Sequence, residues 1–311
     1  MRIVFLASGA FAIPSLEALI GAGHELAALV TQPDRESGRG RALAAPPVRA
    51  VAERRGVPVL QLPRVRAPEA EQALRRLAPE LQVVVAFGQI LPRAVIDVAP
   101  RGTVNVHASL LPRLRGAAPI QWAIANGDGE TGVTTMQIDE GLDTGPLLLA
   151  RALSIGPDET AAELEPRLAR LGGELLIETL SGLEQGTLTP VPQDAARATH
   201  APLLRKADGR VDWSLPARTI ACRARGFHPW PGALAQHEGR LLKLLRVREA
   251  AFGSVAAEPG EVTELGAEGV AVACGAKTAL LLEEVQPESR RAMSAAAWAQ
   301  GARLRPGVRL G

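Results

Sequence analysis

Short apolar segments alternate with longer amphipathic ones along the first half of the chain. The apolar segments are rich in Val and Leu and lack an apolar–polar alternation, which is typical of strands covered on both faces. They predict strands at Ile3–Leu6, Leu26–Thr31, Val57–Leu60, Leu81–Ala86 and Thr103–His107. The amphipathic segments have helical spacing and predict helices at Pro14–Ala22, Val48–Arg55, Pro68–Leu77 and Pro92–Val98. This order indicates a doubly wound, mostly parallel, Rossmann-like α/β domain, whose sites form beyond the carboxyl ends of the strands.

A longer amphipathic segment predicts a helix around Thr160–Leu183. Its leucines recur at the spacing of one helix face, and Thr160-Ala-Ala-Glu163 has the order of a capping box. Pro166 lies inside this segment, where a proline costs a helix about 3 kcal/mol. The alternatives are a helix that begins at Pro166 and one that bends there.

The pattern changes after residue 189. A polar, proline-containing stretch follows, which is typical of a linker. Beyond it, short apolar runs are broken by Gly and Pro at Gly239–Val247, Gly260–Thr263, Gly269–Ala273 and Thr278–Val285. Such runs are typical of a small, OB-like β-barrel. We therefore expect an α/β domain over residues 1–189, a linker over 190–207 and a C-terminal β-barrel over 208–311.

Composition excludes several classes of protein. With 47% hydrophobic residues, the chain can bury a sizeable core. No apolar run approaches the roughly 18 residues of a membrane span, and the apolar start is too short for a signal peptide. Cys222 and Cys274 lie far apart, and the five histidines form no pair at ligand spacing. We expect a cytoplasmic protein with reduced thiols, no membrane partner and no metal.

Charge is unevenly distributed although the net charge is only +2. Residues 1–204 hold 19 Arg, no Lys and 22 acidic residues, whereas residues 205–311 hold 16 basic and 11 acidic residues. A basic second part suits contact with an anion, but a chance surface bias explains these numbers equally well. The lack of Tyr and an aromatic content of 3% argue against binding by many stacked bases.

The densest polar segment runs from Asn105 to Gly116 and begins where the fifth strand ends. If the strand continues through His107, Asn105 and His107 lie on the same face. The amide can donate to a developing oxyanion, and the imidazole can donate or accept a proton near pH 7. On this pattern alone, a structural histidine is the more common outcome.

A second polar segment runs from Asp139 to Gly145, after the strand-like Gly132–Ile138. Its two aspartates and two glycines predict a tight acidic loop, whose carboxylate could orient His107. An ordinary Asp/Gly turn is the alternative. An EF-hand calcium loop is excluded because the alternating ligands and terminal Glu are absent.

Five segments together resemble the folate-dependent formyltransferase family over essentially the whole chain. They are Asn105–Gln121, Gly141–Gly145, Thr31–Gly40, Lys206–Trp213 and Phe227–Pro231. The third resembles the loop of the members that act on methionyl-tRNA, and the last two resemble their C-terminal domain. The resemblance implies transfer of a formyl group from 10-formyltetrahydrofolate to the amine of initiator methionyl-tRNA, without a metal and by a monomer.

The resemblance also implies roles for individual residues. Asn105 would hold the formyl oxygen, and His107 would hydrogen-bond to it or donate a proton. Asp143 would set the imidazole tautomer and take the proton of the attacking amine through water. The folate site would include Ser109, Leu110, Leu111, Pro112, Phe87, Gly88, Gln89, Ile90, Leu91, Asp139 and Gly141. The tRNA contacts would include Arg39, Arg41, Arg205 and Lys206, with Arg223, Arg225 and Lys243 as further phosphate candidates.

Other functions use related sequences. The same trio serves enzymes that formylate glycinamide ribonucleotide or amino sugar nucleotides, and hydrolases of 10-formyltetrahydrofolate. The second domain argues against the glycinamide enzyme, and the loop around Arg39 argues against the hydrolase. A dinucleotide-dependent oxidoreductase is disfavoured because the turn after the first strand, Ser8–Pro14, lacks three spaced glycines. A catalytically inactive RNA-binding protein would have no use for the trio.

Overall fold

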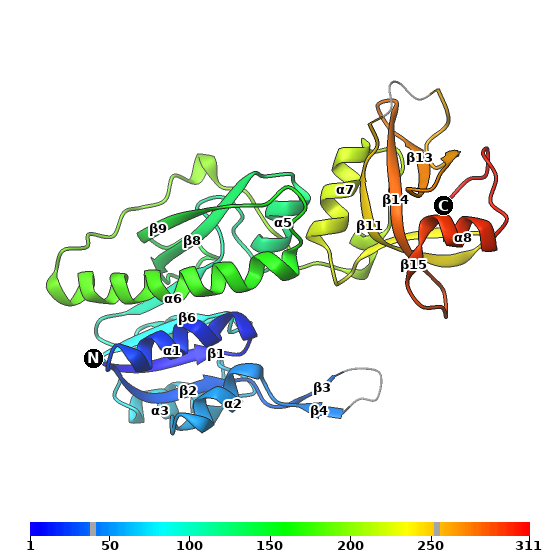
Figure 1. Ribbon diagram of the computed structural model, residues 1–311. Coiled ribbons are helices and arrows are strands. Elements are labelled where there is room, and N and C mark those ends of the chain that lie inside the picture. Colours follow the sequence, from blue (N-terminus) through cyan, green and yellow to red (C-terminus); the bar gives the residue numbers. More distant parts are fainter. Residues whose placement is uncertain (38–41, 252–255) are drawn as a thin grey trace. The chain divides into compact units, whose positions relative to one another are not determined.

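The computed structural model describes residues 1–37, 42–251 and 256–311 (Figure 1). Contacts divide the chain into two compact units that are discontinuous in sequence. The first unit consists of Met1–Pro119, Glu130–Ser154 and Glu165–Pro202, and the second of Ile120–Gly129, Ile155–Leu164 and Leu203–Gly311. This division does not coincide with the expected boundaries at 189 and 207. Residues 190–202, expected as part of a linker, group with the first unit.

A seven-stranded sheet forms the centre of the first unit, with the order β5-β2-β1-β6-β7-β8-β9. The strands are β1 (Arg2–Ala7), β2 (Glu25–Thr31), β5 (Val59–Gln61), β6 (Leu81–Val85), β7 (Thr103–His107), β8 (Glu130–Gln137) and β9 (Leu147–Ser154). Along this order, each neighbouring pair from β5 through β2, β1 and β6 to β7 is parallel. β8 is antiparallel to β7, and β9 is antiparallel to β8. The expected doubly wound, mostly parallel fold is confirmed. Its strand order reverses at β1 and β6, where such sheets form their ligand crevice.

Helices cover both faces of this sheet. They are α1 (Ile13–Gly21), α2 (Pro47–Arg54), α3 (Pro68–Arg76), α4 (Arg93–Ile96) and α6 (Ala161–Gln185), with the 3-10 turns η1 (Ala10–Ala12) and η2 (Ala195–Arg197). On one face, Leu74 of α3 and Val95 of α4 pack in a cluster with Leu6 and Val84. On the other, α6 lies against Val106 at Gly172, where an added Cβ would be 3.0 Å from the valine. Because side chains alternate along a strand, Asn105 lies on the face of α3 and α4.

The helix α6 runs through Pro166, so the predicted helix around Thr160–Leu183 is confirmed and the alternative start at Pro166 is wrong. Its start is stabilised at Thr160, whose backbone N–H (2.9 Å) and Oγ1 (2.8 Å) both donate to the Glu163 carboxylate. This is one half of the expected capping box. Pro166 lies in the second turn, where it removes a single intrahelical hydrogen bond and leaves the rest of the helix intact.

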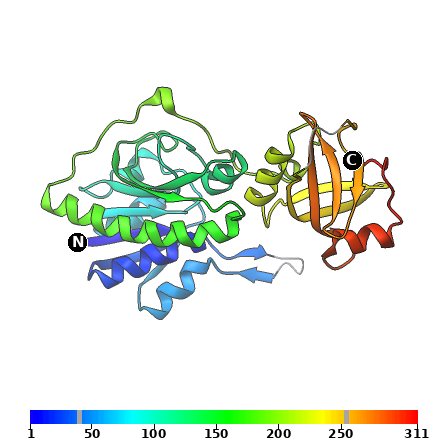
Figure 2. The ribbon, with the colours of Figure 1, turned by 45° about the horizontal axis from the view of Figure 1, so that its top comes forward.

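A two-stranded hairpin leaves the sheet after β2. Its strands β3 (Arg35–Ser37) and β4 (Ala42–Ala44) pair antiparallel and project from the α/β unit (Figures 1 and 2). Arg39 and Arg41, the expected tRNA contacts, lie outside the described residues. The described strands of this hairpin pair with each other, which a simple connection between a strand and a helix does not need.

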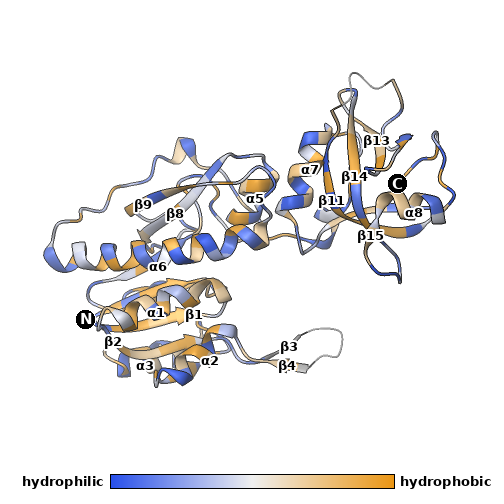
Figure 3. Cartoon of the chain, in the orientation of Figure 1, coloured by the Kyte–Doolittle hydropathy of each residue, from blue (hydrophilic) through white to orange (hydrophobic). Residues whose placement is uncertain are grey.

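An antiparallel six-stranded sheet forms the centre of the second unit. Its strands are β10 (Ala233–His237), β11 (Arg240–Glu249), β12 (Val262–Leu265), β13 (Val270–Cys274), β14 (Thr278–Pro287) and β15 (Met293–Ser294), with the helices α5 (Pro119–Ala125), α7 (Ala217–Gly226) and α8 (Ala295–Gly301) and the 3-10 turn η3 (Lys206–Gly209). Leu242, Val272 and Leu282 of the sheet share a core with Trp213 and Trp298. Figure 3 shows the apolar stretches of these strands. The β character expected of this region is confirmed.

Within the described part of the chain, no helix combines the length and apolarity needed to cross a bilayer.

Cys274 is expected to resist alkylation in the folded protein. Burial raises the pKa of its thiol to about 12, against 9.0 for an exposed thiol, and only the thiolate reacts. At pH 8, iodoacetamide followed by peptide mapping should label Cys274 in urea and leave it unlabelled in buffer. Because the unfolded thiol ionises first, the free energy of unfolding should fall as pH rises above 9. Equal labelling in both states would contradict this burial.

Candidate active site

Asn105 and His107 lie at the carboxyl end of β7, as the sequence predicted. The strand continues through His107, and residues 105 and 107 therefore share a face. Asn105 is half-buried, and within the described residues its side chain has no hydrogen-bond partner. His107 is buried, with 6% of its surface exposed. An unpaired amide thus stands beside a fixed imidazole at the end of a central strand.

The backbone carbonyl of Leu114 fixes the His107 ring. The His107 Nε2 atom is 3.0 Å from the Leu114 oxygen, and because a carbonyl only accepts hydrogen bonds, Nε2 carries a proton. In the neutral ring Nδ1 is then unprotonated. Leu114 therefore sets the tautomer, a role that the sequence interpretation gave to Asp143.

Asp143 faces the free side of the same ring. Its Oδ1 lies 3.7 Å from His107 Nδ1, beyond the range of a direct hydrogen bond. Two acceptor atoms face each other when the ring is neutral, so the contact is attractive only when the ring gains a second proton. Asp143 thus lies close to the Nδ1 edge of the ring without a direct hydrogen bond to it.

The second carboxylate oxygen of Asp143 accepts a backbone hydrogen bond that fixes the side chain. Oδ2 accepts from the Gly116 backbone N–H at 2.8 Å. Gly116 has φ +119°, and a Cβ there would be 2.6 Å from the Ala201 carbonyl oxygen, so only glycine fits. Gly116 of the Asn105–Gly116 segment therefore supplies the N–H that orients Asp143 of the Asp139–Gly145 segment.

The Asp139–Gly145 loop is tight, as its composition predicted. Oδ1 of Asp139 accepts from the Gly141 N–H (3.1 Å) and from Thr144 Oγ1 (2.7 Å). A Cβ on Gly141 would collide with Thr144, and one on Gly145 with the Gln137 carbonyl. The side chain of Asp139 thus stabilises the conformation of the loop.

The Ser109–Pro112 turn is braced internally. Ser109 Oγ donates to the Arg113 carbonyl at 2.6 Å. Thr134 Oγ1 on β8 donates to the Ser109 carbonyl (2.7 Å) and accepts from the Leu111 N–H (3.1 Å). The Leu111–Pro112 peptide bond is cis. The Ser109 hydroxyl therefore already has a partner within the turn.

The Phe87–Leu91 segment follows β6, at the point where the strand order reverses. Phe87 and Leu91 lie in the hydrophobic core rather than on an open wall, whereas Ile90 is 57% exposed. The Phe87 carbonyl accepts from Gln32 Nε2 at 2.7 Å, and Gln89 Oε1 accepts from the Val65 N–H at 2.9 Å. Only Gly88 and Ile90 of this segment have large exposed surfaces.

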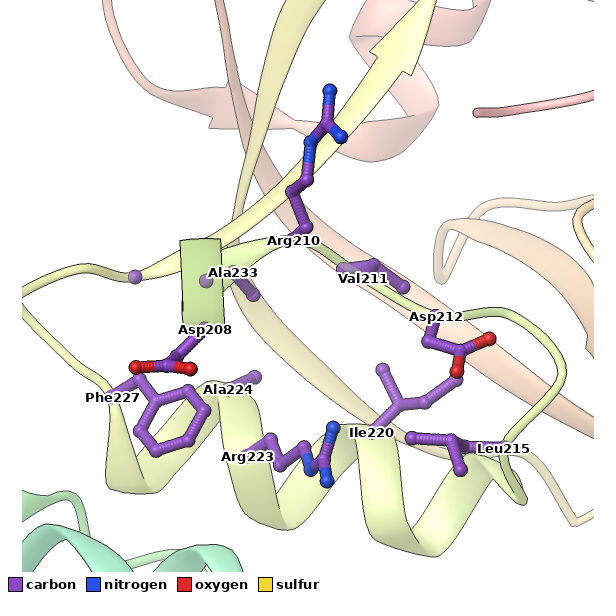
Figure 4. A pocket seen from close by; sticks show the side chains of 12 residues that line it. Asp208, Arg210, Val211, Asp212, Leu215, Ile220, Arg223, Ala224, Phe227 and Ala233 are labelled. Carbon is purple, nitrogen blue, oxygen red and sulfur yellow. The ribbon is translucent and has the colours of Figure 1, made fainter. Parts of the chain in front are cut away.

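The expected tRNA contacts of the second unit are exposed at η3. Arg205 and Lys206 both face solvent, and the Arg205 N–H donates to Asp208 Oδ2 at 2.6 Å. Arg225 differs, because its guanidinium donates to the Glu159 carbonyl at 3.0 Å and so supports the fold of the second unit. Arg223 lines a cavity of about 10 Å³ beside Asp208 and Phe227 (Figure 4), too small for more than a water molecule.

A larger groove of about 490 Å³ lies on the first unit between α1 and α6. Neither cavity is lined by a member of the trio. Among the described residues, no group of three His, Cys, Asp or Glu side chains is placed to hold a metal.

Sequence reasoning missed three residues that shape this site. Leu114 acts through a carbonyl, Thr134 through a hydroxyl on the next strand, and Gln193 through an amide 50 residues away from Asp143. None of these contacts leaves a local pattern in the sequence.

Comparison with known proteins gives a consistent result. Residues 1–180 match the family model described as formyl transferase, and residues 203–303 match formyl transferase, C-terminal domain. Methionyl-tRNA formyltransferase of Anaeromyxobacter dehalogenans (strain 2CP-1 / ATCC BAA-258) is 56% identical over 312 residues, covering 100% of both chains. That of Geobacter metallireducens is 49% identical, covering 100% of this chain and 99% of the other.

Solved structures share the fold at lower identity. The N-formyltransferase from Helicobacter canadensis, in complex with folinic acid and dTDP-3-aminofucose, superposes with a TM-score of 0.67 and 16% identity. The match covers 92% of this chain and 98% of that one.

Proposed function

This chain belongs to the formyl transferase family, and from that membership we infer that it transfers the formyl group of 10-formyltetrahydrofolate to the amino group of initiator methionyl-tRNA. The product is N-formylmethionyl-tRNA, which is used in translation initiation. The observation that carries this conclusion is the 56% identity to a methionyl-tRNA formyltransferase along the full length of both chains.

The geometry supports a division of labour within the proposed trio. The amine nitrogen attacks the formyl carbon, and the carbonyl oxygen becomes negative. Asn105 offers an unpaired amide donor for that oxygen. His107, fixed through Nε2, donates from Nδ1 once it is protonated.

Asp143 is the general base of the proposed reaction. Its carboxylate takes the proton of the attacking amine through water, and the bond from the formyl carbon to folate N10 then breaks. N10 takes up the proton that was removed from the amine, and tetrahydrofolate leaves. The 3.7 Å gap between Asp143 and His107 lets the carboxylate serve the amine while it stabilises the imidazolium.

The folate would bind in the crevice at the reversal of strand order. The braced Ser109–Pro112 turn would present backbone groups to the edge of the heterocycle, and Gly88 and Ile90 would present apolar surface. Phe87 and Leu91 would support this surface from the core, and Asp139 and Gly141 would shape the opposite loop.

The remaining assignments rest on the same function. The second unit, with Arg205 and Lys206 exposed, would contact the phosphates of the tRNA. The enzyme would act as a monomer in the cytoplasm, where translation begins.

A sugar nucleotide is the rival acceptor, because the Helicobacter canadensis structure with that type of ligand shares the fold. Parallel reactions with labelled 10-formyltetrahydrofolate should contain initiator methionyl-tRNA, an amino sugar nucleotide or no acceptor. We expect label to transfer only to the tRNA. Label on the sugar would identify a sugar formyltransferase, and folate turnover without any acceptor would identify a hydrolase.

Replacing Arg39 with Ala is expected to raise the KM for methionyl-tRNA at least tenfold and leave the KM for folate unchanged. Arg39 belongs to the Gly-rich segment between β3 and β4 in the sequence, and a guanidinium can contact a phosphate or an end base. Steady-state kinetics with each substrate varied in turn measure both constants. Arg64→Ala, an exposed arginine in a different loop, is the control. An unchanged tRNA KM in Arg39→Ala would place the contact elsewhere.

A further inference from the structure

Gln193 connects the two loops that carry the proposed catalytic groups. Its Nε2 donates to the carbonyl oxygens of Asp143 (2.9 Å) and Gly145 (2.8 Å). Its Oε1 accepts from Nε (3.1 Å) and Nη2 (2.7 Å) of Arg115. Both amide hydrogens and the amide oxygen are used, so one side chain joins the loop after β8 to the loop after β7.

Arg115 lies in a part of the site where its charge needs a partner. It is only 8% exposed, and within residues 1–37, 42–251 and 256–311 it forms no ion pair with a carboxylate. Burying a cation is costly unless hydrogen bonds compensate for lost water. The Gln193 Oε1 atom supplies these hydrogen bonds, so each of the two side chains holds the other in one conformation.

The same chain segment holds the loop that fixes His107. The Thr199 carbonyl accepts from the Arg115 N–H at 2.9 Å, and the Ala201 N–H donates to the Arg115 carbonyl at 2.7 Å. Thr199 Oγ1 accepts from the Leu114 N–H at 2.9 Å. Leu114 in turn fixes His107. The segment therefore contacts both loops of the site.

Asp143 needs such a support because its backbone is strained. Its φ is +54°, in the left-handed region that non-glycine residues rarely occupy. Hydrogen bonds to the carbonyls of Asp143 and Gly145 hold the peptide that follows Asp143 and the peptide that follows Gly145. Without them the loop can relax, and a displacement of about 1 Å at a reacting group can cost about 10²-fold in rate.

We propose that Gln193 and Arg115, together called the clasp, position Asp143 for proton transfer in the reaction of the proposed function. The clasp residues act through Asp143 and its loop, which makes them positioning residues. The segment 190–202, expected as a linker between domains, is by this assignment a working part of the active site.

The substitution Gln193→Glu separates the two halves of the clasp. A glutamate still accepts from Arg115, but its carboxylate has no N–H for the carbonyls of Asp143 and Gly145. We expect an unchanged or higher Tm, a kcat at least tenfold lower and a folate KM within twofold of wild type. Hydrogen exchange of the amides in residues 139–145 should be faster. Gln193→Ala should lower kcat at least as much and also lower Tm.

Asp194→Ala is the matched control, since the side chain of this exposed neighbour accepts from the Ala196 N–H and from no other described residue. A wild-type kcat in Gln193→Glu would overturn the positioning role. A lower Tm with normal kcat per folded molecule would also overturn it and leave a structural role. If the wild-type protein forms no formyl-methionyl-tRNA, the proposed function fails, and unchanged exchange in residues 139–145 would separately refute the clasp.

Discussion

Asp143→Asn is expected to lower kcat by about 10²–10⁴, the range that removal of a general base produces. The asparagine has the same shape, and its remaining oxygen can still accept from the Gly116 N–H, which holds the carboxylate at 2.8 Å. It can neither take the amine proton nor offset the charge of a protonated His107. Folding should therefore be preserved while turnover is lost.

Single-turnover transfer to methionyl-tRNA, together with Tm, measures this effect. Glu140→Gln is the control, because Glu140 is an exposed carboxylate in the same loop. A rate near that of wild type at saturating substrates would remove Asp143 from the reaction.

Asn105→Ala is expected to lower kcat by about 10²–10³, as the loss of one oxyanion donor does. Its amide has no partner within the described residues, so the substitution breaks no hydrogen bond of the folded chain. Tm should change little. Because the donor acts mainly on the transition state, kcat and kcat/KM should fall together while the KM for folate stays constant.

The other asparagine of the chain, Asn126, provides the comparison for this variant. It is exposed and belongs to the second unit, so Asn126→Ala should keep the wild-type rate. A raised folate KM with normal kcat in Asn105→Ala would assign Asn105 to ground-state binding instead.

Strands that are buried on both faces were predictable from the sequence. The segment Thr103–His107 matches β7 at both ends, because a continuous apolar run in an α/β pattern has few other interpretations. That match placed Asn105 and His107 on one face before any contact was known. The identity of the reaction came from longer motifs, whose resemblance to a family adds information that spacing alone does not contain.

Elements with weaker patterns were missed. Strand β9 (Leu147–Ser154) lies at the end of the sheet order beside β8 and has an alternating, partly exposed pattern. The helix α7 has many charged and small residues. The domain boundaries differ from the contact units because Ile120–Gly129 and Ile155–Leu164 group with distant sequence. A linear reading of composition cannot show such grouping.

The residues 190–202 illustrate the limit most clearly. Proline and polar side chains are typical of a linker, yet Gln193 and Thr199 make specific hydrogen bonds to both loops of the site. Their partners lie at least 48 residues away in sequence. Their role depends on these tertiary hydrogen bonds, which the local sequence pattern does not predict.

The most direct test follows the formyl group to its final atom. Wild-type protein is incubated with isotopically labelled 10-formyltetrahydrofolate and initiator methionyl-tRNA, and the aminoacyl end is analysed by mass spectrometry alongside the released folate. We expect labelled N-formylmethionine in a 1:1 ratio with tetrahydrofolate, about one formyl per turnover. Tetrahydrofolate and free formate without labelled formylmethionine would contradict transfer to the methionyl amine.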